Sequence, residues 1–163
     1  ENNFINMIAA AKRYVWITTP YLIIDFNLST ALKNAALRGV DVRIVTPHIP
    51  DKKFVFDMTR STYRQLMKAG VKIYEYTPGF MHAKNVVVDD VLAFVGTINF
   101  DYRSLTHHFE CGAVMYRTPC IADMVADFNE VFGKSQQIDP KTFKMSKLAT
   151  FSTLVLQLFA PML

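Results

Sequence analysis

Apolar and polar positions near the start of the chain follow first a helical and then an extended pattern. Four apolar residues recur at the spacing of one face of an α-helix: Phe4, Met7, Ile8 and Ala11. Residues 14–18 (YVWIT) are β-branched or aromatic and stop before Pro20, which is typical of a buried strand. The pattern therefore predicts a helix followed by a buried strand.

The same order of elements occurs twice more along the chain. Residues 25–38 combine capping residues with an Ala-rich helical segment, and residues 42–45 (VRIV) predict the next strand. Residues 53–69 predict a third helix and residues 71–76 (VKIYEY) a third strand, and each of these two helices ends at a glycine. Alternating helices and strands of this kind favour a parallel sheet covered by helices.

The pattern changes after the Pro-Gly pair at residues 78–79. Residues 82–88, 92–97 and 109–116 predict strands, and the first two are close enough in sequence to form a hairpin. Residues 121–132 have amphipathic helical spacing. We therefore expect an α/β fold, a three-layer α/β/α sandwich with a mixed, mostly parallel central sheet.

The last segment, residues 148–163, is apolar but only sixteen residues long, and it contains Pro161. It is short for a bilayer span of about 20 residues. It predicts a terminal helix that either packs on a neighbouring element or lies at a membrane interface. We expect residues 1–163 to form a single domain that ends in this helix.

Composition agrees with a folded domain and favours anionic partners. Half of the 163 residues are apolar and 20% are charged, and the formal net charge is +4. This charge suits phosphates, nucleic acids or acidic lipid headgroups without choosing among them. We expect Cys111 and Cys120 to be reduced thiols. Because the chain begins with Glu1 and not Met, we expect it to be a piece of a longer protein.

The strongest chemical signal is the segment His82-Ala83-Lys84. His82 and Lys84 are two residues apart in a predicted strand, so both side chains should point to one face. Thr97 and Asn99 have the same spacing in the next strand. If the hairpin turns at residues 90–91, His82 lies opposite Asn99 and Lys84 opposite Thr97. The four polar side chains would then form a cradle for a phosphodiester, with a base or nucleophile for its phosphorus.

Three further residues complete the predicted site. Gly96 would let the backbone approach the bound anion closely. Asp89 lies an odd number of residues from His82 and at the turn, so we expect it to have a structural role. Glu110, on the third strand, is a candidate to accept a proton from the second ring nitrogen of His82.

These residues resemble the motif of the phospholipase D superfamily. Its members carry HxK, then four residues and Asp, then a segment GSxN, which appears here as GTIN with Thr97 in place of Ser. The run HAKNVVVDDVLAFVGTINFDYRSLTHHFE resembles the second motif region of bacterial cardiolipin synthases, as do TTPYLIID, ALKNAALRGVDVRIVTP and KAGVKIYEYTPGFMHAK. The resemblance covers the chain from about residue 14 to its C-terminus, and identifies it with the C-terminal catalytic half of such an enzyme.

The resemblance implies a site and a reaction. His82, Lys84, Thr97 and Asn99 match the family's active-site positions, and Glu110 matches the acidic residue that orients the motif histidine. Family members use two motifs per site, so the partner would be the N-terminal motif half of the same protein or a second copy. The implied reaction transfers a phosphatidyl group between two phosphatidylglycerol molecules through a phosphohistidine.

The resemblance also implies the remaining roles and the setting. In two-motif relatives the first-motif histidine is usually taken as the nucleophile, which would make His82 the general acid and then the base, although a histidine suits either role. No metal or other cofactor takes part. The substrate is phosphatidylglycerol or another phospholipid at a membrane surface, and the full-length protein belongs to the bacterial cell membrane, with this piece itself soluble or peripheral.

Two other functions stay open. The chain could be a single-motif phosphodiesterase or nuclease in which a homodimer pairs two copies of His82, although it lacks the basic stripe typical of nucleic-acid binding. It could also be a non-catalytic domain that binds anionic lipid.

Several residues near the motif have plainer expected roles. Asp101 and Arg103 resemble the family's DxRS segment, and we expect them to brace the turn as a buried ion pair. We expect the histidines at residues 107–108 to lie in a solvated loop. Tyr21 and Phe80 are expected in the core, as aromatic side chains in such places usually are.

Overall fold

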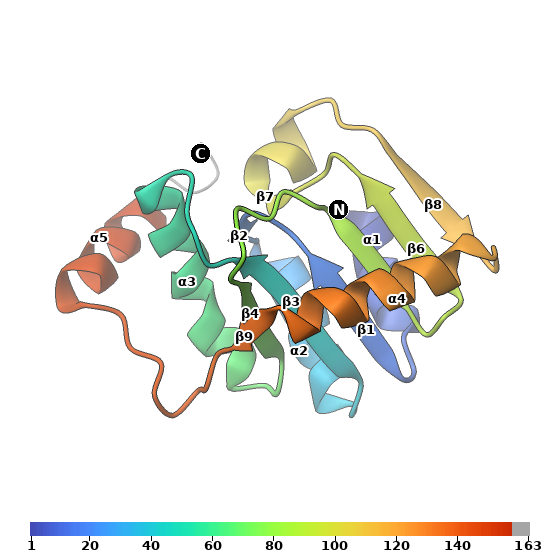
Figure 1. The fold of residues 1–163 in the computed structure, drawn as a ribbon. Coiled ribbons are helices and arrows are strands. Elements are labelled where there is room, and N and C mark those ends of the chain that lie inside the picture. Colours follow the sequence, from blue (N-terminus) through green and yellow to red (C-terminus); the bar gives the residue numbers. More distant parts are fainter. Residues whose placement is uncertain (158–163) are drawn as a thin grey trace.

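The centre of the structure, a computed structural model that describes residues 1–157, is a seven-stranded sheet (Figure 1). Its strand order is β8-β6-β5-β1-β3-β4-β9. The strands of this sheet are β1 (Tyr14–Thr18), β3 (Asp41–Pro47), β4 (Lys72–Tyr76), β5 (Asn85–Val88), β6 (Leu92–Gly96), β8 (Gly112–Tyr116) and β9 (Ser135–Gln137). A separate short pair joins β2 (Leu22–Ile23) to β7 (Phe100–Asp101).

The seven-stranded sheet is mixed, as expected, but it is not mostly parallel. Strand β1 pairs in parallel with β3, and β3 with β4. The other four pairings in this described sheet are antiparallel. The expectation of a mostly parallel sheet is wrong for two reasons. The hairpin joins β1 in antiparallel orientation, and the short polar strand β9, which has no apolar pattern to reveal it, adds antiparallel to β4.

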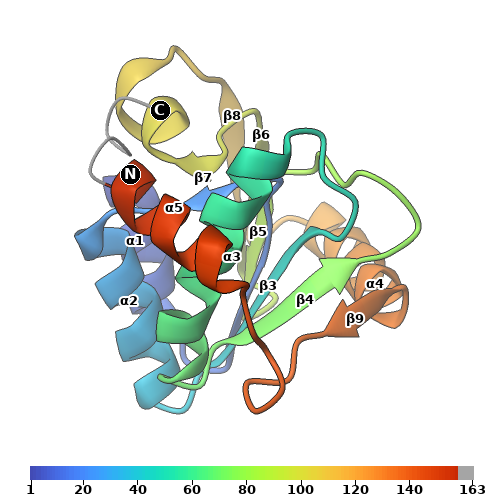
Figure 2. The ribbon, with the colours of Figure 1, turned by 90° about the vertical axis from the view of Figure 1, so that its left-hand side faces the viewer.

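Helices cover both faces of the sheet and complete the expected three layers. On one face lie α1 (Asn2–Ala10), α2 (Phe26–Leu37) and α3 (Lys53–Met67), and on the other lies α4 (Cys120–Gly133) (Figure 2). Helix α5 (Lys147–Gln157) packs outside α3, away from the sheet, and a short π-helix (Arg103–His107) follows β7. The predicted terminal helix is present up to Gln157, and residues 158–163 lie outside the described part. Within residues 1–157, no helix is both long enough and apolar enough to span a membrane.

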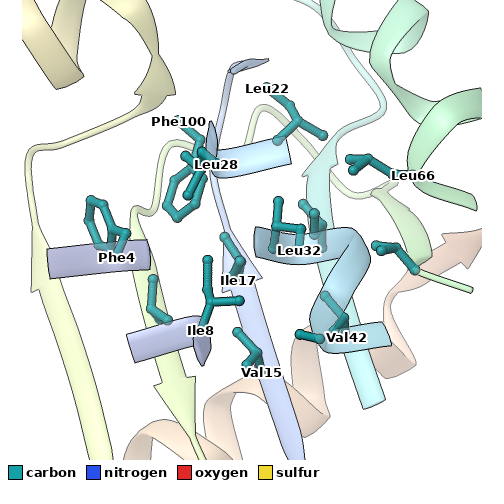
Figure 3. Close-up of a cluster of buried hydrophobic side chains, with 14 of the residues drawn as sticks. Phe4, Ile8, Val15, Ile17, Leu22, Leu28, Leu32, Val42, Leu66 and Phe100 are labelled. Carbon is teal, nitrogen blue, oxygen red and sulfur yellow. The ribbon is translucent and has the colours of Figure 1, made fainter. Parts of the chain in front are cut away.

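Strand β1 is buried on both faces because it lies in the middle of the sheet. Val15 and Ile17 are fully buried against the side chains of α1 and α2, as Figure 3 shows. Tyr14 and Trp16, on the alternate face, pack against α4. Each large apolar side chain buried in this way contributes about 1.5–3 kcal/mol. This double burial explains why the strand has a continuous apolar sequence without alternation.

The predicted helix ends are confirmed by local hydrogen bonds and backbone angles. Asp25 caps α2 by accepting a hydrogen bond from Leu28 N at 2.8 Å. Gly39 and Gly70, after α2 and α3, have φ angles of 90° and 99°. These angles lie in the left-handed region, where a residue without a Cβ is least strained.

The β5–β6 hairpin is tied to the start of β1 by its turn. One carboxylate, that of Asp89, accepts hydrogen bonds from three consecutive backbone N–H groups, those of Lys12, Arg13 and Tyr14, at 2.7–2.9 Å. The adjacent Asp90 accepts hydrogen bonds from the side chains of Arg13 and Tyr14, both at 2.5 Å. Burial raises the pKa of Asp89, but the three N–H groups outweigh it and hold the pKa below its usual value. The turn thus fixes the hairpin to the centre of the sheet.

Candidate active site

The structure brings the His82 and Lys84 side chains together. Lys84 Nζ donates a hydrogen bond to the carbonyl oxygen of His82 at 2.5 Å and lies 2.9 Å from His82 Nδ1. Both residues lie in an extended segment just before β5, which begins at Asn85. The strand therefore starts three residues later than expected, because the pairing of this segment with β1 begins only at Asn85.

Lys84 carries a buried charge without a carboxylate partner. Its side chain is only 8% exposed, and within residues 1–157 no carboxylate lies within ion-pair distance of its ammonium group. Burial lowers the pKa of Lys84, and the more distant charges of Glu110 and Asp101 oppose this shift. A buried cation without a counter-ion is costly unless an anion binds beside it.

The predicted polar residues line one open pocket of about 430 Å³. Its walls come from the segment before β5, the end of β6 and the loop after it. The lining residues are His82, Ala83, Lys84, Asn85, Val95, Gly96, Thr97 and Asn99. Four polar side chains therefore converge, as the spacing of the motif predicts. Asn85 and Val95 also line the pocket, although the sequence pattern pointed only to a strand at these positions.

The hairpin register differs by one residue from the expected one. The turn comprises residues 89–91, and β5 and β6 pair Asn85 with Val95 and Val88 with Leu92. Extended past the strand ends, this register brings Lys84 opposite Gly96. The predicted pairing of Lys84 with Thr97 and of His82 with Asn99 is wrong. Asp89 and Asp90 adopt left-handed φ angles of 54° and 61°, and this makes the longer turn possible.

Asn99 presents an unused hydrogen-bond acceptor inside the site. Its Nδ2 donates to Ser104 Oγ at 3.1 Å. Its Oδ1 is buried and has no hydrogen-bond partner in the described part of the chain. A buried polar atom left in this way costs free energy that a bound hydroxyl or ammonium donor would recover. Asn99 is therefore placed to accept a hydrogen bond from a ligand.

Glu110 lies away from the ring of His82 and bonds to Thr97. Thr97 Oγ1 donates to Glu110 Oε2, and the same hydroxyl accepts from Cys111 N at 3.0 Å. The other carboxylate oxygen lies 3.9 Å from His108 Nδ1. No hydrogen bond joins Glu110 to His82 in residues 1–157, and the proton acceptance expected of Glu110 stays a prediction. Glu110 precedes β8 and is not part of a strand, which changes where its side chain points.

Gly96 is required by close packing between strands. A Cβ added at this position would lie 2.5 Å from Cys111 O, 2.6 Å from Gly112 Cα and 2.7 Å from the ring of Phe94. Backbone atoms of this kind cannot move aside cheaply. The contact between β6 and the segment leading into β8 is therefore a reason for glycine that the sequence did not indicate. The close approach of the backbone to a bound anion stays a prediction.

Three of the plainer expectations also need correction. Asp101 does not pair with Arg103 in the described structure. Its carboxylate accepts a hydrogen bond from Ser104 N at 2.8 Å, and Arg103 is exposed. Phe80 is not in the core, because 39% of it is exposed and its ring centroid lies 5.7 Å from that of His82. Tyr21 is partly buried and its hydroxyl donates to Asp51.

The imidazole of His82 is electrostatically biased toward its neutral form. Burial and the Lys84 ammonium lower the pKa of His82, and the nearby Asp51 carboxylate opposes them. Since Lys84 Nζ donates to Nδ1, the neutral ring carries its proton on Nε2. Asp51 was missed at the sequence level, although its place just after β3 puts it at the same sheet edge as the motif. Within residues 1–157, no cluster of three or more His, Cys, Asp or Glu side chains could hold a metal ion.

Known proteins resemble this chain both in sequence and in fold. Residues 4–132 match the family model described as cardiolipin synthase, PLD-like domain. A cardiolipin synthase from Halalkalibacterium halodurans is 46% identical over 141 residues, which are 86% of this chain and 28% of that protein. The chain thus spans less than a third of the length of this relative.

Two solved structures share the fold at low sequence identity. Phosphatidylserine synthase from Haemophilus influenzae has a TM-score of 0.76 at 16% identity, covering 99% of this chain and 43% of that one. Nuc, a phospholipase D family member from Salmonella typhimurium, has a TM-score of 0.74 at 19% identity, covering 84% and 89%. At these identities the likeness concerns the fold alone.

Proposed function

This chain belongs to the cardiolipin synthase, PLD-like domain family, and on that premise we propose that it supplies one half of a two-histidine site for phosphatidyl transfer. The reaction joins two phosphatidylglycerol molecules into cardiolipin and releases glycerol. The other half of the site comes from the N-terminal motif region of the same protein or from a second copy. The isolated piece is expected to be inactive alone.

One observation carries this proposal, the buried ammonium of Lys84 without a carboxylate partner. It lines the same pocket as the imidazole of His82 and the unused acceptor of Asn99. A phosphodiester would supply the missing negative charge through its nonbridging oxygens, and charge that develops on them during reaction would be stabilised by Lys84. The net charge of +4 agrees with an anionic substrate.

The proposed phosphatidyl transfer takes place in two steps. An imidazole nitrogen of the partner motif forms a bond to phosphorus while the bond from phosphorus to the glycerol oxygen breaks, and protonated His82 gives its proton to that oxygen. The hydroxyl of a second phosphatidylglycerol then gives its proton to His82. The oxygen of that hydroxyl bonds to phosphorus as the phosphorus–nitrogen bond breaks. Binding of the anionic phosphodiester favours the protonated state of His82 that the first step needs.

The hydrogen bonding of His82 supports the role of acid and base over that of nucleophile. A nucleophilic Nε2 needs a free lone pair, so the ring proton would have to lie on Nδ1 and be held there by an acceptor. In this chain Nδ1 faces the ammonium of Lys84 and not a carboxylate. The ring of the free chain therefore holds its proton on Nε2. The imidazolium that forms when the phosphodiester binds gives up this proton, which leaves Nε2 free to accept the next one.

The setting follows from the substrate. Phosphatidylglycerol resides in lipid bilayers, so we propose that the full-length protein works at the bacterial cell membrane and that this domain meets the membrane surface. No metal ion, other cofactor or nucleic acid enters the proposed steps.

Reconstitution with the missing half tests the proposal. The chain is mixed with the N-terminal motif half of a related cardiolipin synthase and phosphatidylglycerol vesicles, and cardiolipin is measured by lipid chromatography. We expect product only when both halves are present, and none with His82→Asn. The control Asp123→Ala, at an exposed position on α4, should retain activity. Absence of product with a demonstrably assembled complex would refute the proposal.

A second candidate is a homodimeric phosphodiesterase acting on nucleic acid. It is favoured by one observation: this single-motif chain covers 89% of the length of Nuc. Cleavage of DNA by the chain alone, lost in His82→Asn and falling steeply with salt, would establish this alternative over phosphatidyl transfer.

A further inference from the structure

Helix α5 has its polar and apolar sides reversed relative to an ordinary packed helix. Its one residue classed as buried in the described structure is Thr153. Four large apolar residues are exposed instead, with exposed fractions of 79% for Leu148, 67% for Phe151, 59% for Leu154 and 43% for Val155. Exposed apolar side chains grouped in this way are typical of a surface that binds something apolar.

The exposed residues form a stripe that faces away from the protein. Leu148, Phe151 and Val155 follow the i, i+3, i+7 spacing of a single helix face. The side of α5 toward α3 is polar, where Gln157 Nε2 donates to Ser61 Oγ at 3.2 Å. Figures 1 and 2 show α5 outside α3, on the side away from the sheet. The stripe is therefore open at the outer surface of the described structure.

Positive charge borders this stripe. Three exposed lysines, Lys141, Lys144 and Lys147, precede or begin the helix, and the sequence has no acidic residue after Asp139. A groove of about 900 Å³ beside α5 adds further cations from α2 and α3. The basic residues that line it are Lys33, Arg60, Arg64, Lys68, Lys141 and Lys144, and Asp25 is the one acidic residue in its lining.

We propose that α5 docks this domain onto an anionic phospholipid bilayer. The stripe enters the boundary between headgroups and acyl chains, and the lysines contact the headgroups. Charge complementarity selects this occupant, because an apolar face bordered mainly by cations matches an anionic lipid surface. A second copy of this chain would bring the same lysines against one another.

The proposal deepens the membrane setting of the proposed function but does not depend on its chemistry. Docking uses α5 and the preceding lysines, whereas phosphatidyl transfer uses the pocket around His82 and Lys84. The two can therefore fail separately. Vesicles of phosphatidylserine in phosphatidylcholine serve as the probe, because they supply negative charge without the proposed substrate.

Flotation of the 163-residue chain with vesicles tests the docking. Wild-type protein and His82→Asn should bind vesicles containing phosphatidylserine equally. Leu148→Ser combined with Phe151→Ser should lower the partition coefficient about tenfold or more, because two apolar side chains no longer enter the lipid. Each replacement of Lys141, Lys144 or Lys147 by Gln should lower it about fivefold on these vesicles.

The matched control is Leu37→Ser, an apolar residue that is 72% exposed at the end of α2, and it should bind like wild type. Circular dichroism should show that every variant is folded. The proposal is overturned if wild type does not float with the vesicles, if the Leu148 and Phe151 double variant floats as well as wild type, or if phosphatidylcholine vesicles bind equally at all salt concentrations. A dimer that dissociates in the double variant, without vesicle binding, would show that a second copy covers the stripe and would also overturn it.

Discussion

Asp89→Ala tests whether the aspartate of the motif serves the fold and not the chemistry. Its carboxylate accepts hydrogen bonds from three consecutive backbone N–H groups at the start of β1, some 75 residues away in sequence. Such bonds to a charged acceptor contribute about 1 kcal/mol each at a partly exposed site. Alanine at the left-handed φ of 54° adds about 1 kcal/mol more. We expect the free energy of unfolding to fall by about 3–4 kcal/mol.

Asp89→Asn separates the contribution of the hydrogen bonds to the free energy of unfolding from that of the backbone angle. Asparagine tolerates the left-handed region and keeps one acceptor oxygen, which can still serve Arg13 N and Tyr14 N. Its amide nitrogen would face Lys12 N, so one bond is lost. We expect a loss of about 1–2 kcal/mol, well below that of alanine. Urea unfolding, followed by the fluorescence of the single tryptophan, Trp16, measures both variants.

The pH dependence gives an independent check on Asp89. Its folded pKa lies below the unfolded value of about 3.9. Its stabilisation is therefore complete above about pH 4 and is lost as the pH falls through the folded pKa. The stability gap between wild type and Asp89→Asn should narrow as the solution is acidified below pH 4. Equal stability of the three proteins at pH 7, with activity lost in the reconstituted enzyme, would refute the structural role.

The remaining predictions concern the pocket itself. Gly96→Ala should lower the free energy of unfolding by about 2–3 kcal/mol, because its Cβ would meet Cys111 O at 2.5 Å. Gly133→Ala, with no atom within 4 Å of its Cβ, is the control and should stay within about 0.5 kcal/mol of wild type in urea unfolding. Lys84→Met should reduce cardiolipin formation at least about 100-fold. Its unfolding free energy should not fall, since a buried unpaired charge is removed; a clear loss of stability would contradict this. In Lys84→Met the pKa of His82 should rise, because burial and the ammonium lower it in wild type, and an unchanged NMR titration of the ring would argue against that coupling.

Elements with a strong periodic pattern were predictable from the sequence. Residues 14–18 coincide with β1, and the third helix was predicted from its first residue to within two of its last. The secondary structure of such segments is predictable because their apolar residues all face the core. Strand β9 could not be predicted, since its sequence, Ser-Gln-Gln, is polar and it exists only because the edge of β4 offers hydrogen bonds. Its formation depends on tertiary structure alone.

The candidate pocket was predictable as a set of residues, but its contacts were not. Spacing alone was enough to bring His82 and Lys84 onto one side and to place Asn99 nearby. The one-residue register shift depends on two aspartates in left-handed conformations, which sequence propensity does not specify. The hydrogen bond from Thr97 to Glu110 depends in turn on that register and on where β8 begins. The local pattern therefore predicted which residues line the pocket, and the turn geometry decided their hydrogen-bond partners.

The central place of β1 has a consequence for how the chain reaches this fold during synthesis. Strand β1 pairs with β3 on one edge, and its other edge can be paired only by β5, which follows about 70 residues later in the chain. Without β5, the parallel half of the sheet has an apolar strand edge with unpaired backbone groups. Such an edge can form hydrogen bonds with other chains and aggregate. The motif-bearing hairpin is thus also the segment whose pairing closes this apolar edge of β1.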